Sequence, residues 1–92
     1  IQEWWGINDQ IRGIGRRLAA ASYRVVIPDL YRGRSTAAAD EANHLMNGLD
    51  WPGAVRDIAG ACAFLKDQVP SARVGLTGYC LGGALTIAGL VH

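Results

Sequence analysis

The 92-residue sequence predicts an α/β protein in which a parallel sheet lies between two layers of helices. Two short β-branched runs, residues 23–27 and 73–77, alternate with segments whose apolar residues recur at helical spacing. Such alternation implies parallel strands joined by right-handed crossovers. The predicted order is a strand stub ending at residue 3, a helix, a strand, a helix, a strand and a helix, which makes a three-layer αβα architecture.

The first predicted helix starts after Asn8, a residue type that caps helix N-termini. Its apolar stripe consists of Ile11, Ile14, Leu18 and Ala21. Gly13 and Gly15 lie within this helix, each at a cost of up to about 1 kcal/mol relative to alanine. We therefore expect close packing to compensate for these glycines, although both lie off the stripe.

The second predicted helix starts at Asp50, has a proline in its first turn and ends before Val69 and Pro70. Its apolar stripe consists of Val55, Ile58, Ala59, Cys62 and Leu65. Residues 30–43 are expected to form a loop rich in alanine, glycine and arginine. The last predicted helix covers residues 84–91.

The most specific motif is GYCLGG at residues 78–83, between the last strand and the last helix. It has the form of a nucleophile elbow, in which a nucleophile between glycines occupies a strained turn. Gly78 and Gly82 have no Cβ to collide with neighbouring backbone. Cys80 would stand at a helix N-terminus, which favours a thiolate and a developing oxyanion. The alternative is a glycine-rich turn that merely packs, with a buried, inert cysteine.

Other binding functions fit the sequence less well. The glycine-rich turn lacks the lysine of a P-loop and the glycine spacing of a dinucleotide site. A net charge of +1 does not indicate the basic surface that binds nucleic acid. No apolar stretch approaches the roughly 18 residues that cross a membrane. The two cysteines suggest neither a zinc cluster nor a disulfide framework, so we expect no metal and a reducing, cytoplasmic setting.

Three strings resemble the dienelactone hydrolases (carboxymethylenebutenolidase-like), a branch of the α/β-hydrolase fold. They are QEWWGIN at residues 2–8, PDLY at residues 28–31 and GYCLGG at residues 78–83, in the order and roughly the spacing of the family. The resemblance covers the whole chain. It implies hydrolysis of a small-molecule carboxylic ester or lactone through an acyl-cysteine intermediate, with no metal or organic cofactor.

The resemblance also implies roles for individual residues. Cys80 would be the nucleophile, and Glu3 would contact its resting thiol. The backbone N–H groups of Trp4 and Leu81 would form the oxyanion hole, in agreement with the general arrangement of this fold. The glycines of the elbow would be Gly78, Gly82 and Gly83.

Some residues of the family pattern are missing. The family's catalytic Asp and His follow the nucleophile, and neither His44 nor His92 occupies such a position. Dienelactone-specific members hold the substrate carboxylate with an arginine. That position falls near Ala39, although Arg32 and Arg34 are nearby. A broader carboxylic ester or lactone substrate is therefore expected.

We expect residues 1–92 to form a single partial α/β-hydrolase domain, truncated at both ends, of a monomeric parent enzyme. The chain alone is expected to be inactive, because the triad Asp and His are absent. The alternative is a non-catalytic, thiol-bearing α/β module that binds a small molecule or a partner and uses Cys80 as a redox or ligand contact.

Overall fold

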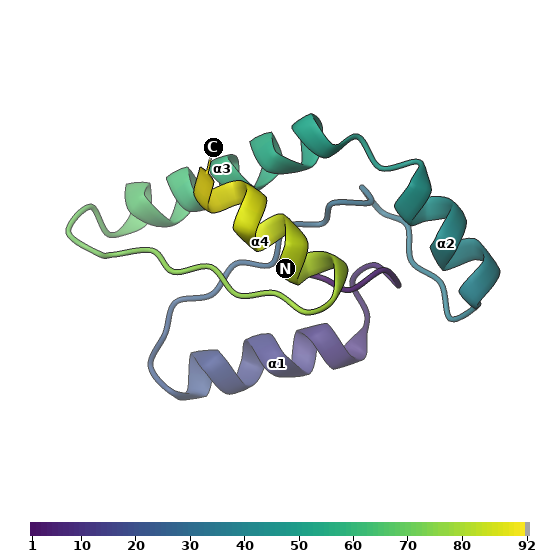
Figure 1. The fold of residues 1–92 in the computed structure, drawn as a ribbon. Helices are drawn as coiled ribbons and strands as arrows, with labels where there is room; N and C mark the ends of the chain where they lie inside the picture. The colour runs from purple at the N-terminus through teal and green to yellow at the C-terminus, as the bar shows by residue number, and fades with distance from the viewer. Residues whose placement is uncertain (92) are drawn as a thin grey trace.

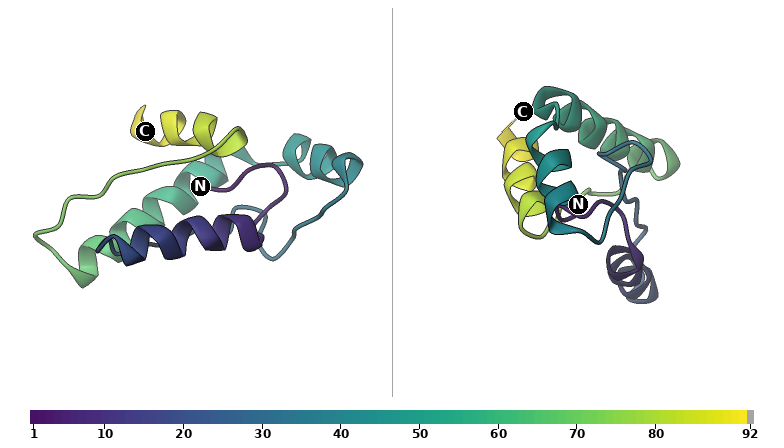
Figure 2. Two further views of the ribbon diagram at one scale, coloured as in Figure 1. Left: turned by 90° about the horizontal axis from the view of Figure 1, so that it is seen from below. Right: turned by 90° about the vertical axis from the view of Figure 1, so that its right-hand side faces the viewer.

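The computed structural model describes residues 1–91 and contains four helices (Figure 1). They are α1 (Asp9–Ala20), α2 (Ala39–Asn47), α3 (Trp51–Gln68) and α4 (Leu81–Val91). Two segments that run as extended chain, residues 23–29 and 72–79, pass between α1 on one side and α3 and α4 on the other. The right-hand view of Figure 2, which looks along α1, shows the same separation of α1 from α3. The helical layers of the predicted architecture are therefore present.

The predicted starts of α1 and α3 are confirmed, together with their caps. The side chain of Asn8 accepts a hydrogen bond from the N–H of Ile11 at 3.1 Å. The side chain of Asp50 likewise accepts from the N–H of Gly53 at 3.1 Å. Each cap satisfies an N–H group that has no partner within its own helix.

The prediction of a loop over residues 30–43 is wrong from Ala39 onward, where α2 begins. No side-chain hydrogen bond caps α2, so the sequence signal that marks α1 and α3 is missing. Its first turn carries Asp40 and Glu41, whose charges suit a helix N-terminus. A smaller difference concerns α4, which starts at Leu81 rather than at Ala84.

The two predicted strands do not form a ladder, and the structure assigns no strand within residues 1–91. An isolated antiparallel bridge joins Gly6 and Ser35. In residues 24–29 and 73–79 no backbone N–H group donates a hydrogen bond to another described residue. The structure of residues 1–91 therefore does not confirm the predicted sheet. The physical reason is that residues 1–3 reach only one end of each segment and supply no ladder partner along it.

The core lies between α3, α4 and the chain that follows the first extended segment. Its buried residues are Leu30, Tyr31, Leu45, Ala54, Ile58, Leu81 and Leu85. Close packing on α1 is found at one of the two glycines: a Cβ at Gly15 would lie 2.9 Å from Cδ1 of Ile27, whereas Gly13 faces open space. Among the described helices, none combines the length and the apolar character needed to cross a membrane.

We predict that the isolated 92-residue chain has low stability. Unpaired backbone in both extended segments is costly, and α4 leaves Ile87, Leu90 and Val91 at least 67% exposed. Differential scanning calorimetry should show a broad transition, and a dye for apolar surfaces should bind before heating. A sharp, cooperative transition of a soluble monomer would contradict this prediction.

Candidate active site

Cys80 occupies the turn between the second extended segment and α4. Its φ angle is 56°, in the left-handed region that residues other than glycine seldom adopt. Its side chain is exposed, and the next residue, Leu81, is buried and begins α4. A strained backbone at this point therefore holds the thiol at the surface beside a helix N-terminus.

Gly78 and Gly82 are required by the close approach of backbone segments. A Cβ at Gly78 would come closer than 3.0 Å to the carbonyl group of Gly82, a separation that real Cβ atoms essentially never show. A Cβ at Gly82 would meet the carbonyl oxygens of Ile1 and Gln2 in the same way. At Gly83 a Cβ would make only an ordinary contact of 3.7 Å, so this position has room for a side chain.

The first residues of the chain lie against the elbow (Figure 1). The amino group of Ile1 donates a hydrogen bond to the carbonyl of Thr77 at 2.6 Å. The side chain of Gln2 is fully buried and accepts from the N–H of Leu30 at 3.2 Å. These contacts carry the chain directly into Glu3, so the segment that contains Glu3 starts beside the turn of Cys80. Sequence reasoning missed this role of Gln2, because nothing local marks a buried glutamine.

The N–H group of Leu81, which follows Cys80, has no acceptor within the described chain, and the N–H group of Trp4, which follows Glu3, has none either. In contrast, the N–H of Gly82 is engaged by the carbonyl of Tyr79 at 3.0 Å. The Trp4 ring packs edge-on against Trp5, with centroids 5.3 Å apart, which orders this segment. The N–H group of Leu81, at the start of α4 and next to Cys80, is therefore free to donate to an anion or a carbonyl oxygen.

No histidine is hydrogen-bonded to the thiol in the described part of the chain. His44 is exposed on α2, and His92 lies outside the described residues. Residues 1–91 also contain no group of three or more His, Cys, Asp or Glu side chains that could hold a metal ion. The groups gathered at the elbow therefore fit a thiol nucleophile and an oxyanion, but they supply no general base.

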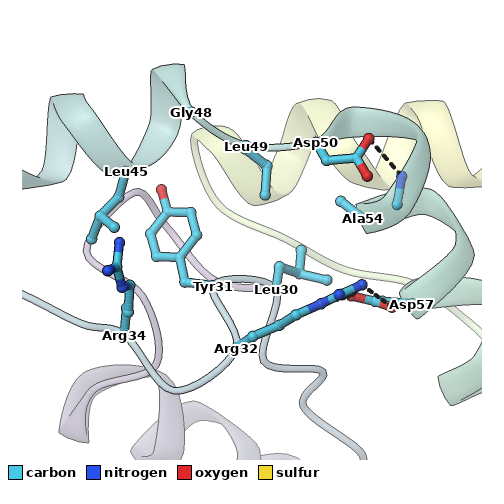
Figure 3. A pocket seen from close by; sticks show the side chains of 11 residues that line it. Leu30, Tyr31, Arg32, Arg34, Leu45, Gly48, Leu49, Asp50, Ala54 and Asp57 are labelled. Atoms are coloured by element: carbon cyan, nitrogen blue, oxygen red, sulfur yellow. Dashed lines mark hydrogen bonds and ion pairs between the residues drawn. The ribbon is translucent and has the colours of Figure 1, made fainter.

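A separate pocket of about 220 Å³ lies between residues 30–34, the end of α2 and the start of α3 (Figure 3). The hydroxyl of Tyr31 is buried there without a hydrogen-bond partner among the described residues, and burial raises the pKa of Tyr31. Arg32 forms an ion pair with Asp57 at 3.2 Å, and Arg34 extends beside Leu45. Neither Cys80 nor Glu3 lines this pocket, so it is distinct from the elbow.

Comparisons with known proteins agree with the motifs. The family model described as "Dienelactone hydrolase family" matches residues 1–92. The chain is 34% identical over 94 residues to the carboxymethylenebutenolidases of Pseudomonas putida and Pseudomonas knackmussii. It is 32% identical over 97 residues to protein usf of Aquifex pyrophilus. The alignments cover 91% of this chain for the two Pseudomonas proteins and 95% for the Aquifex protein.

The match over its whole length places the chain in a class of hydrolases that have the α/β-hydrolase fold. More narrowly, the chain belongs to the dienelactone hydrolase family. The resemblance predicted from the three strings is thereby confirmed. The chain spans 40% of the length of each Pseudomonas relative and 41% of the Aquifex relative.

We predict that Gly82→Ala loosens the contact between residues 1–2 and α4. A methyl group there would meet two carbonyl oxygens, which gives an expected loss of about 1–3 kcal/mol in the free energy of unfolding. Gly60→Ala is the matched control, because a Cβ at this helical glycine faces open space and should stabilise the chain by about 0.5–1 kcal/mol. Urea titration followed by circular dichroism measures both changes, and equal effects would contradict the prediction.

Proposed function

We propose that the whole protein hydrolyses carboxylic esters or lactones through an acyl-cysteine intermediate on Cys80. The observation that carries this proposal is the turn itself: an exposed thiol at a positive φ angle, directly before α4, in a chain of the dienelactone hydrolase family. The name carboxymethylenebutenolidase, borne by the two Pseudomonas relatives, supports a lactone as a substrate.

In the proposed reaction the thiolate of Cys80 attacks the carbonyl carbon of the substrate, and the carbonyl oxygen becomes negatively charged. The N–H groups of Trp4 and Leu81 donate to this oxygen. The C–O bond of the ester or lactone then breaks, and the leaving oxygen takes a proton while the acyl group stays on Sγ. Water next attacks the thioester, which releases the carboxylic acid and restores the thiol. One water is consumed for each ester bond.

Glu3 is proposed to lie against the resting thiol of Cys80. Support comes from the contacts of the two preceding residues, Ile1 with Thr77 and Gln2 with Gly82, which start this segment beside the elbow. A carboxylate at this place would influence the thiol through its charge without entering the bond-making steps.

The general base is proposed to lie outside the 92 residues. The relatives are longer, since the chain spans 40% of the length of each Pseudomonas protein. The Asp and His of the family are assigned to that additional length. Residues 1–92 then carry the nucleophile and the oxyanion donors of a partial domain, and they form the acyl-enzyme without completing turnover. The whole enzyme is further proposed to be a cytoplasmic monomer that needs no metal or organic cofactor.

The activation of Cys80 is tested by alkylation. In the folded chain, iodoacetamide should modify Cys80 of the Cys62→Ser variant faster than Cys62 of the Cys80→Ser variant, because Cys80 is exposed beside a helix N-terminus and Cys62 is half-buried. With Cys80→Ser, the half-buried Cys62 should react more slowly in the folded chain than in the unfolded one. If the two cysteines are labelled slowly and at equal rates, the non-catalytic thiol-bearing module becomes the better description.

The acyl-enzyme is tested with p-nitrophenyl acetate. Mass spectrometry of the 92-residue chain should show one acetyl group on Cys80, and nitrophenol release should stop near one equivalent. Cys80→Ser should abolish this stoichiometric acetylation, while Cys62→Ser should leave it unchanged. Acetylation spread over lysines, or equal modification of Cys62 and Cys80, would contradict the proposed nucleophile.

A further inference from the structure

The side chain of Gln2 is fully buried, although it is polar. Its Oε1 atom accepts a hydrogen bond from the N–H of Leu30 at 3.2 Å, while its Nε2 atom is buried without a partner among the described residues. A buried donor without an acceptor destabilises the fold, so the bond to Leu30 is made at a cost in stability. This cost indicates a role for Gln2 beyond packing.

The backbone of Gln2 lies against the elbow. A Cβ at Gly82 would meet the carbonyl oxygen of Gln2 at a separation that real Cβ atoms essentially never show. Gly82 is the second residue of α4, and the turn of Cys80 directly precedes this helix. Gln2 therefore joins two distant parts of the chain, because its side chain is bonded to Leu30 and its backbone packs on the start of α4.

Residues 30–36 hold the first segment of the chain a second time, a few residues further on. The N–H of Thr36 donates to the carbonyl of Trp5 at 2.9 Å, and an isolated bridge joins Gly6 to the same stretch. Gly6 has a φ angle of 88°, which suits glycine. Residues 3–4 therefore lie between two attachments to one loop.

We propose that Gln2 is a positioning residue, which sets the place of the Trp4 N–H relative to Cys80. The side chain of Gln2 fixes one end of the segment to Leu30, and its backbone keeps that end against α4. The N–H of Trp4 has no acceptor within the described chain, so no hydrogen bond of its own orients it. The inference rests on the oxyanion role proposed for Trp4, and Gln2 itself touches no reacting atom.

Two reagents separate positioning from general damage to the thiol. Attack of Cys80 on p-nitrophenyl acetate develops an oxyanion, whereas iodoacetamide loses iodide from a saturated carbon. In the Cys62→Ser background, Gln2→Met should slow acetylation of Cys80 at least about tenfold and change its alkylation by less than about twofold. Methionine keeps the length and bulk of the side chain but offers no oxygen to the N–H of Leu30.

Two further variants guard against a loss of folding. Gln2→Asn keeps the amide but is one methylene shorter, so it should lower the ratio of acetylation to alkylation in the same direction. The matched control is Asp50→Ala, which also removes a side-chain acceptor from a backbone N–H, at the cap of α3. It should leave the ratio unchanged. The proposal is overturned if both Gln2 variants keep the parent ratio, or if Asp50→Ala lowers it as far.

Amide exchange distinguishes a failure of this inference from a failure of the proposed function. The N–H of Thr36, which donates to Trp5, should exchange at least about tenfold faster in Gln2→Met than in the parent chain. If the parent chain is not acetylated at Cys80, the proposed function fails, and this exchange rate alone decides whether Gln2 positions the segment. An unchanged rate at Thr36 overturns the proposal even if acetylation slows.

Discussion

The backbone of residues 1–2 lies so close to Gly82 that no side chain fits between them. Backbone carbonyls cannot swing aside as a flexible side chain can, so this approach sets the position of α4 against the start of the chain. Gly78 lies equally close to the carbonyl group of Gly82, so a side chain does not fit at Gly78 either. The exposed thiol of Cys80 and the free N–H group of Leu81 therefore lie beside the first two residues of the chain.

The helical layers depend on what lies between them. α1 and α3 have good caps, but isolated helices of this length draw most of their stability from burying an apolar face. The apolar faces of α1 and α3 line a groove of about 660 Å³ between the two helices and do not contact each other directly. The region around α3 and α4 has its own core and the elbow, whereas α1 is held mainly through contacts such as that of Gly15 with Ile27. The core and the elbow therefore belong to the same part of the molecule, and α1 lies apart from them.

Much of this organisation could be predicted from residue types. Asn8 and Asp50 marked two helix starts because a cap is a contact between near neighbours in the sequence. The GYCLGG string indicated a strained turn, and Cys80 has the positive φ angle that such a turn needs. α2 escaped prediction since no capping side chain precedes it. The structure does not confirm the strands at residues 23–27 and 73–77, because β-branched composition does not by itself provide a pairing partner.

Residue types alone were enough to predict the capped helices, the glycine-rich elbow and membership of the dienelactone hydrolase family. The packing of distant segments was needed to show that Gly78 and Gly82 are sterically required, that Gln2 is buried and that the N–H group of Leu81 stays free. The two sets of features differ in the sequence separation of the residues that make them. Capping and turn geometry depend on residues three or four positions apart. The bond from Ile1 to Thr77 joins residues separated by 76 positions, and no local pattern specifies it.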